Sequence, residues 1–475
     1  MKREWILWVW AVTAGCSVGP DYTPPQMDLP VRFPDESGAP PAGIAHWWKN
    51  FNDPKLDEIM NRAIESNFDL RQATARLRQA RAQRGVTAAG QYPEVDVSGR
   101  VGRYHTSANA IPPPAVSGFP LPVGITGNLY QAGFDASWEI DIFGGVRRAV
   151  EAADRDVEAA VEDRRAVLVT LMAEVAENYV ELRAFQAQMA IARRNLRSQQ
   201  DTLALTDSRF KQGLASALDA ARARAQVATT ESSIPLLETL AGRSIRRLGL
   251  LTGQEPMALW GILVEPQEIL LRPPEVPLGL PTDLLRRRPD IRRAEKLLAA
   301  ATARIGVATA DLYPKFSLTG MFGLQSATSG NFFSWPSRLW SFGPTVAWPL
   351  FAGGRIDSNI RVQDALTEQA LLQYQSTVLA SIAEVEDSLT AYRQEQVRRT
   401  SQADAVDSNR KAAELSHQLY AQGLIDFLSV QQAQRDLYLT EDLLAQSVRA
   451  VSSNLIALYK ALGGGWEELE LPQQP

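Results

Sequence analysis

The sequence has little of the material from which most enzyme sites and membrane helices are built. Its 475 residues include one cysteine and three histidines, too few for a disulfide scaffold or most transition-metal sites. No stretch approaches the ~20 consecutive apolar residues that cross a bilayer as a helix. The net charge is only -5, so the charge balance does not point to nucleic acid as a partner. We therefore expect no metal and no cofactor, and any membrane contact must come from strands or an anchor.

The one cysteine, Cys16, ends a short targeting segment. Two basic residues open the chain, an apolar stretch runs from Trp5 to Ala14, and small residues stand just before Cys16. This pattern predicts a secretory signal over residues 1–15. Its last residues resemble the bacterial lipoprotein cleavage box, which implies diacylglycerol and palmitate on Cys16 and, with Ser17 next, transport to the outer membrane. The alternatives are an ordinary signal peptide or a buried cysteine.

The rest of the chain is built from two copies of one unit. Residues 69–102 align without a gap on residues 290–323, and 13 of the 34 paired positions are identical. A repeat of this kind points to an architecture made of similar structural units. The predicted parts are a lipid-anchored segment at 16–52, repeats at 53–253 and 283–465, an irregular Pro-rich connector at 254–282, and a tail at 466–475.

Each repeat has the same internal order. A helix rich in Ala, Arg and Gln ends at Tyr-Pro, because proline disfavours helix in the residue before it. Two strands follow, and a Gly-Gly pair then begins a long helix that reverses at a single glycine. The predicted helices are 53–89, 145–212 and 216–251, then 282–310, 355–422 and 425–462; the predicted strands are about 92–104, 129–142, 313–325 and 339–351.

The strand segments alternate between apolar and polar residues at every step. From Tyr130 to Ile142 one face is apolar and aromatic while the other is polar, which indicates a strand with two different faces. Membrane barrels have this pattern, and so do soluble sandwiches. Four strands cannot close a barrel, so either several chains close one together or the strands are soluble. The residues expected to face the lumen are Asp96, Arg100, Asp135, Glu139 and Asp141, which would favour cations slightly.

The long helices carry a sustained heptad pattern. Between Gly145 and Gly213 the chain has no Pro and no Gly, enough for a helix on the order of 100 Å at ~1.5 Å per residue. Apolar residues recur every seven positions from Val161 to Phe210, and the second repeat keeps the same register. Heptads predict helices packed in coiled pairs. A rod-like spacer is the simpler alternative for this feature alone.

Several motifs together resemble the outer membrane factor family of the TolC and OprM type, specifically its lipoprotein (NodT-like) branch. The motifs are Gly19-Pro20-Asp21-Tyr22, Ser137 to Gly144, Arg209 to Gly213, Arg287 to Arg292, Ile305 to Ala308 before Tyr313-Pro314, and Leu458 to Trp466. They cover nearly the whole chain. The resemblance implies a homotrimer, mainly helical, in which a 12-stranded β-barrel in the outer membrane joins a 12-helix α-barrel in the periplasm.

The resemblance also implies a function. Such a channel passively conducts substrates from a periplasmic adaptor and a proton-driven (RND-type) inner-membrane pump to the cell exterior. In the periplasmic aperture Leu428 would be the constriction and Arg435 a latch, while Gln432 stands where the family usually has Asp and Asp426 lies nearby. The tips that adaptor hairpins grip would include Phe210, Gly213, Leu214, Tyr420, Gly423 and Leu424.

Two other classes of function are alternatives to a channel. We find no phosphate-binding Walker loop, no zinc-binding His/Glu helix and no serine elbow, which disfavours an enzyme. A periplasmic coiled-coil tether without a pore is the second alternative. The exported substrate stays open among drugs, aromatic acids, metals and siderophores.

Overall fold

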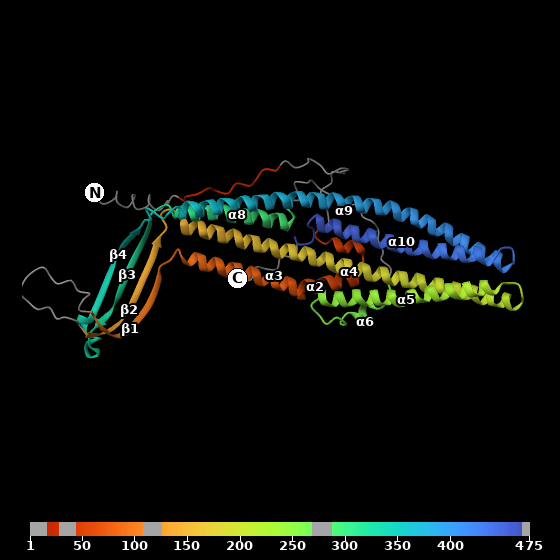
Figure 1. Ribbon diagram of the computed structural model, residues 1–475, viewed down its shortest axis with the longest axis horizontal. Coiled ribbons are helices and arrows are strands. Elements are labelled where there is room, and N and C mark those ends of the chain that lie inside the picture. Colours follow the sequence, from red (N-terminus) through yellow and green to blue (C-terminus); the bar gives the residue numbers. More distant parts are fainter. Residues whose placement is uncertain (1–16, 28–43, 108–125, 268–286, 468–475) are drawn as a thin grey trace, which may run out of the picture. The chain divides into compact units, whose positions relative to one another are not determined.

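The computed structural model describes residues 17–27, 44–107, 126–267 and 287–467, so Cys16 lies outside the described residues. The chain divides into two compact units, whose elements are labelled in Figure 1. Both sequence repeats contribute to both units. The sheet unit is drawn from Met1–Pro25, Arg78–Glu158 and Glu295–Leu372, and the helical unit from Gln26–Leu77, Ala159–Ala294 and Gln373–Pro475.

The sheet unit contains one antiparallel sheet with the strand order β1-β2-β3-β4. Its register runs without interruption, so residues two apart on a strand stay on one face throughout. The strands are β1 (Glu94–His105), β2 (Thr126–Ile140), β3 (Lys315–Ser326) and β4 (Arg338–Ala347). Each repeat therefore supplies one hairpin, and the two hairpins pair through β2 and β3.

The strands begin later and end earlier at the helix side than the sequence predicts. The Tyr92 N–H donates to the Ala89 carbonyl at 3.0 Å, and Tyr313 bonds Ala310 in the same way at 3.1 Å, so both tyrosines belong to helix ends. At the far end of β2, the Ile142 N–H turns back to the Ile140 carbonyl at 2.8 Å and closes the strand. On the loop side the strands extend one to three residues further than predicted.

The predicted strand 339–351 is also too long, since β4 ends at Ala347. Pro349 follows, and proline has no N–H to donate to a strand ladder. Trp348 instead uses its indole Nε1 to donate to the Leu312 carbonyl at 3.0 Å, just as Trp138 donates to Gln91 in the first repeat.

The helices follow the predicted order with small differences at their ends. No described helix combines the length and the hydropathy that a membrane crossing requires. The two long helices have 67 residues each and the two return helices 35 each. The helices are α2 (Pro54–Ser66), α3 (Phe68–Ala89), α4 (Gly145–Lys211), α5 (Ala217–Leu251), α6 (Trp260–Leu263), α8 (Pro289–Ala310), α9 (Arg355–Ala421) and α10 (Phe427–Ala461), with short 3-10 turns η1 (Trp47–Phe51), η3 (Ser329–Asn331) and η4 (Trp335–Ser337).

The prediction of one helix over residues 53–89 is wrong, because the chain breaks at Asn67. The Asn67 Nδ2 donates to the Leu251 carbonyl at 2.9 Å, and its Oδ1 accepts from the Leu70 N–H at 3.0 Å. One side chain thus binds the end of α5 and caps the start of α3.

Two other predicted boundaries need correction. The connector was expected to be irregular, but its described part, to residue 267, contains the short helix α6. The predicted start at residue 282 lies outside the described residues. The helix predicted over 282–310 is interrupted at Arg288, and α8 begins at Pro289, a position where proline suits the first turn of a helix.

Both hairpin turns of the helical unit depend on glycine. Gly213 and Gly423 have φ values of +78° and +79°, which residues with a side chain rarely adopt. After each of them a backbone N–H reaches back into the preceding helix, and at the first turn Leu214 donates to the Arg209 carbonyl at 2.8 Å. This is the Schellman type of helix end, and it lets the chain reverse at once.

The core of the helical unit joins the heptad seams of both long helices. The aromatic segment η1 packs into it, and the Trp47 ring stacks on Tyr459 at 5.4 Å. The buried heptad positions are Leu168, Val175 and Leu182 in α4 and Val378, Val385 and Tyr392 in α9. The predicted seam is therefore a packed interior along this part of the helices.

Candidate functional site

The sheet has one apolar face that is open to the surroundings. In the described residues, the side chains on this face meet in rows across all four strands, as in the row Val97–Phe134–Phe322–Trp340. Exposed fractions reach 79% for Phe342 and 74% for Val97. Its large apolar residues are Val95, Val97, Val101, Tyr130, Phe134, Trp138, Ile140, Phe316, Leu318, Phe322, Leu324, Trp340, Phe342, Pro344 and Val346. An apolar face of this extent needs a cover, either lipid or another protein surface.

The opposite face holds four of the five predicted lumen residues. Asp96 lies directly across from Asp135, whose carboxylate accepts a hydrogen bond from Ser98 Oγ at 2.8 Å. Arg100 lies across from Gln131 on the same face. Glu139 is opposite a serine of β3, also on this face. This face is therefore polar and carries more carboxylates than cations.

Asp141, the fifth predicted lumen residue, lies beyond the end of β2. Its Oδ2 accepts from the Arg147 backbone N–H at 2.8 Å and from Arg147 Nε at 3.3 Å. Its side chain is only 16% exposed. Asp141 thus stabilises the first turn of α4, where a carboxylate also suits the helix dipole.

Both outer strands of the sheet have one free edge. Within the described residues, β1 pairs only with β2, and β4 pairs only with β3. Each outer edge therefore presents backbone N–H and C=O groups that need partners. A sheet with open edges and an apolar face is incomplete in a membrane.

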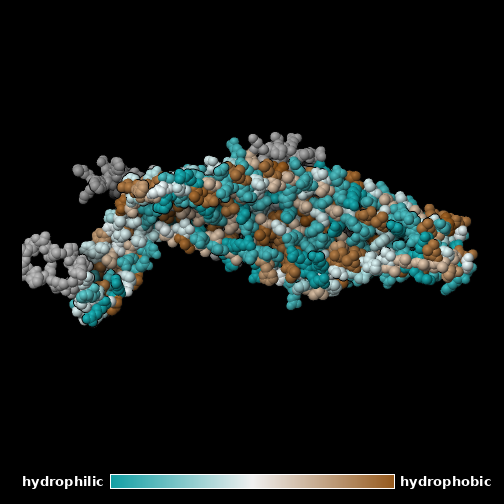
Figure 2. Space-filling view, viewed as in Figure 1, coloured by the Kyte–Doolittle hydropathy of each residue, from teal (hydrophilic) through white to brown (hydrophobic). Residues whose placement is uncertain are grey.

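The helical unit ends in two turns whose exposed residues match the predicted tips. Phe210, Leu214 and Leu424 are 43%, 64% and 67% exposed, and hydrophobic surface is visible at these turns in Figure 2. Tyr420, also predicted as a tip contact, is only 3% exposed. Its ring packs edge-on against Phe427 at 6.0 Å, so it supports the turn from inside.

One arginine joins the two turns to each other. The Arg209 guanidinium, at the end of α4, lies 4.7 Å from the centre of the Tyr420 ring and also donates to the Tyr420 carbonyl at the end of α9. Tyr420 in turn donates its hydroxyl to Thr206 of α4 at 3.3 Å. The two hairpins of one chain are thus bound at their tips by contacts from residues far apart in the sequence.

The predicted aperture residues lie on the first turns of α10. Leu428 is 52% exposed. Asp426 is the N-cap of the helix, and the hydrogen bond from Ser429 holds the pKa of its carboxyl below the usual value. Arg435 is exposed and has no ion pair with a described carboxylate of its own chain. The predicted latch therefore has no partner inside the described chain.

The amide of Gln432 is occupied by a carboxylate that the sequence did not single out. Its Nε2 donates to both oxygens of Asp436, at 2.9 and 3.0 Å, one helical turn further along α10. A carboxylate is therefore present near the expected ring position, but it is bound by the glutamine.

The segment that follows Cys16 is held against the sheet unit by Arg148. The Val18 N–H donates to the Phe143 carbonyl at 3.1 Å, and Arg148 Nε donates to the Val18 carbonyl, also at 3.1 Å. Arg148 also binds Asp21 at 2.6 Å. Burial opposes the charge of Arg148, but hydrogen bonds with Asp21 and Glu151 outweigh it and raise its pKa. Residues 17–21 thus have a defined place beside the helix end of the sheet.

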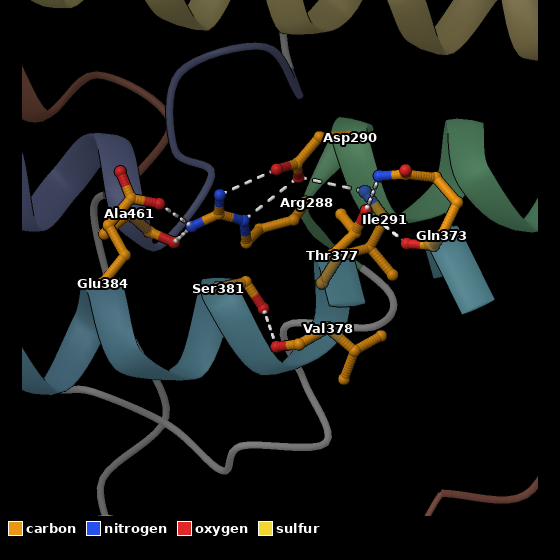
Figure 3. A network of polar contacts seen from close by, with 9 residues as sticks. All are labelled: Arg288, Asp290, Ile291, Gln373, Thr377, Val378, Ser381, Glu384 and Ala461. Atoms are coloured by element: carbon orange, nitrogen blue, oxygen red, sulfur yellow. Dashed lines mark hydrogen bonds and ion pairs between the residues drawn. The ribbon is translucent and has the colours of Figure 1, made fainter. Parts of the chain in front are cut away.

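A second buried arginine stabilises the helical unit. Figure 3 shows Arg288 between Asp290 on one side and Glu384 with the Ala461 carbonyl on the other. Nη1 lies 2.7 Å from both the Glu384 carboxylate and the carbonyl. Burial opposes its charge, yet the bonds to Asp290 and Glu384 raise its pKa. This network ties the start of α8 to α9 and α10, so its role is structural.

The groups that sequence reasoning missed are Arg148, Asp436 and the role of Arg209. Arg209 belongs to the motif Arg209 to Gly213, but nothing in that motif indicates a contact with a residue 211 positions away. Among the residues that the structure describes, no group of histidine, cysteine and carboxylate side chains could hold a metal ion.

Both repeats match proteins whose family is known. A sequence profile described as outer membrane efflux protein matches residues 59–254 and 280–464. The pyoverdine export outer membrane protein OpmQ of Pseudomonas aeruginosa is 33% identical over 463 residues, covering 94% of each chain. Nodulation protein T of Rhizobium leguminosarum bv. viciae is 29% identical over 95% of this chain and 91% of its own. The solved outer-membrane channel OprN matches with a TM-score of 0.86 and 35% identity, over 95% of this chain and 100% of that one.

Proposed function

The chain belongs to the outer membrane efflux protein family, and from this premise we propose that three copies close one pore around a shared axis. It lies in the outer membrane and is an exit channel for efflux, not an enzyme. The observation that carries the proposal is the four-stranded sheet with two open edges and an exposed apolar face.

The strand count favours three copies over two. Two copies of a four-stranded sheet give eight strands, and side chains fill the interior of a barrel that small. Three copies give twelve strands, which leave room for a lumen lined by the polar face. Ring closure also removes every open edge, because β4 of each copy pairs with β1 of the next.

The purified protein tests this proposal in two measurements. We expect a trimer that survives mild heating in detergent, and stable ion conductance when it is added to a planar lipid bilayer. A compact monomer with no conductance would contradict the proposal. A trimer without conductance would favour the periplasmic tether instead.

We propose that Cys16 carries diacylglycerol and palmitate. The arrangement of residues 17–21 supports this, because Arg148 and the Phe143 carbonyl hold them beside the helix end of the sheet, on the membrane side proposed here. Mass spectrometry of the N-terminal peptide would then find Cys16 as the first residue with added acyl mass. An unmodified cysteine, or a cut elsewhere, would contradict the proposal.

We propose that the turns at Gly213 and Gly423 bind a periplasmic adaptor that serves an RND-type pump. Leu214 and Leu424 are exposed apolar side chains at these turns, and a hydrophobic surface of a partner protein could bury both of them. Changing both leucines to serine should weaken co-purification with the adaptor about tenfold or more. The matched control is Leu250→Ser, an exposed leucine at the other end of α5. Equal binding by both variants would rule out the turns as the contact.

We expect only weak block of the channel by multivalent cations. Gln432 replaces the usual carboxylate, and its amide occupies part of the hydrogen-bonding capacity of Asp436. In the Gln432→Asp variant, a three-fold ring of paired carboxylates would attract trivalent cations, so the blocking concentration should fall about tenfold. The measurement is single-channel conductance with trivalent cation added on the periplasmic side.

The control for this variant is Gln446→Asp. Gln446 donates to Asp442 at 2.7 Å with a similar one-turn spacing, but it lies further along α10 from the turn. If Gln432→Asp blocks no better than Gln446→Asp, the amide of Gln432 serves only to pack the helix.

A further inference from the structure

The apolar face of the sheet carries formal charge only at one end. In the described strands, Arg103 and Arg338 are the only Lys, Arg, Asp or Glu side chains on this face. Both lie at the loop end of the sheet, and each belongs to one of the two edge strands, β1 and β4. Every carboxylate of the strands lies on the other face. In the described strands, the apolar face therefore carries only positive charge, and only at its loop end.

Counted along its own strand, each arginine lies eight residues from a valine at the helix end, although the strands are staggered and Arg338 shares a row with Gly99. Arg103 is eight residues beyond Val95 on β1, and Arg338 is eight residues from Val346 on β4. Eight residues at ~3.3 Å each give roughly 26 Å along a strand. A tilted membrane strand crosses the hydrocarbon in roughly 9–11 residues. Each of these stretches contains nine residues, counting both ends. Both guanidinium groups therefore lie where the hydrocarbon ends and the headgroups begin.

The turn before β4 holds Arg338 in an aromatic setting. Its guanidinium stacks 3.8 Å from the ring centre of Trp335, which is itself 76% exposed. Two serine hydroxyls, of Ser334 and Ser337, donate to the Asn331 carbonyl at 2.6 and 2.7 Å and fold the turn. An ordered turn that presents tryptophan and arginine together suits the interfacial layer of a membrane.

The neighbours of these arginines are neutral. Arg103 lies across from Asn128, and Arg338 lies across from Leu324. Neither arginine forms an ion pair with a carboxylate among the described residues. Arginine binds phosphate through two parallel N–H groups, so each guanidinium is suited to a phosphate ester at this level.

We propose that Arg103 and Arg338 bind the phosphate groups of anionic lipids in the outer leaflet. This inference rests on the proposed trimeric channel. Ring closure places β4 of one copy beside β1 of the next, so both arginines line the seam between copies and a bound lipid would span it. At the helix end of the same face the described strands carry aromatic and aliphatic side chains, Trp138 among them, but no charge, so the site distinguishes the two leaflets.

Native mass spectrometry of the purified trimer tests the site, with lipid A as the probe. The trimer should retain lipid A that carries its phosphates and lose the same lipid after the phosphates are removed enzymatically. In the Arg103→Gln/Arg338→Gln double variant, retention should fall about thirtyfold, at roughly fivefold for each basic side chain near an anionic surface. Inorganic phosphate at the same concentration should not compete, because the acyl chains also contact the apolar face.

The matched control is Arg100→Gln, on the same strand but on the polar face. It should retain lipid A as the unmodified protein does. Equal retention of phosphorylated and dephosphorylated lipid by the unmodified trimer would overturn the inference, even if the double variant fails to fold. Full competition by inorganic phosphate would assign the site to a free anion instead. Conductance of the unmodified trimer is recorded in parallel, so failure of the channel itself is distinguished from failure of the lipid site.

Discussion

Replacing Phe134 with arginine is expected to abolish assembly of the protein in the outer membrane. Phe134 lies in the middle of β2, on the apolar face between Val97 and Phe322, and is 54% exposed. An arginine facing lipid at the membrane midplane costs ~2–4 kcal/mol. Three copies multiply this to roughly 6–12 kcal/mol per trimer, as large as the whole stability of many domains. Membrane fractionation and detergent electrophoresis should find essentially no heat-stable trimer.

The same charge on the other face should be harmless. Ser137 lies three residues along β2 from Phe134, on the polar face and directly across from Glu94. Ser137→Arg therefore gains a carboxylate neighbour and faces water in the proposed lumen. Normal trimer from Ser137→Arg together with none from Phe134→Arg would locate lipid on one face only. If both variants assemble equally well, the apolar face does not contact lipid.

The features that sequence could predict are those that depend on local pattern. Alternation assigned both faces of the sheet, because the side-chain period of a strand is two and the register has no bulge. Gly213 and Gly423 located the turns, because only glycine adopts their positive φ easily. The repeat itself predicted that both halves would have the same elements in the same order.

What sequence could not predict depends on contacts between distant residues. Asn67 breaks a helix that has continuous helical composition, because its side chain binds a carbonyl at Leu251. Asp141 continues the alternation of β2 in sequence, yet it binds the first turn of α4. Tyr420 is predicted as an exposed tip contact, but its ring packs against Arg209 and Phe427. The position of each of these side chains depends on a contact that the local sequence pattern does not predict.

Replacing Arg209 with alanine is expected to open the periplasmic end of the channel. Its guanidinium stacks on Tyr420 and donates to that residue's carbonyl, so it binds the end of α4 to the end of α9. A cation–π contact contributes ~0.5–2 kcal/mol and a hydrogen bond from a charged group ~1.5–3 kcal/mol. In Arg209→Ala both are lost. Because about 1.4 kcal/mol is a factor of ten, an equilibrium between joined and separated tips should move at least tenfold toward separation.

The expected readout is a rise in the open probability or the conductance of single channels, with entry of larger solutes from the periplasmic side. Arg224→Ala is the matched control, since Arg224 forms an exposed ion pair with Asp207 at 2.8 Å near the same turn, and such pairs contribute little. A lower melting temperature for Arg209→Ala with unchanged conductance would mean that the contact only stabilises the fold. Higher conductance at nearly normal trimer stability would mean that the two tips separate when the channel opens. In the described chain, the contacts of Arg209 with Tyr420 join the end of α4 to the end of α9, so their loss acts on these two turns.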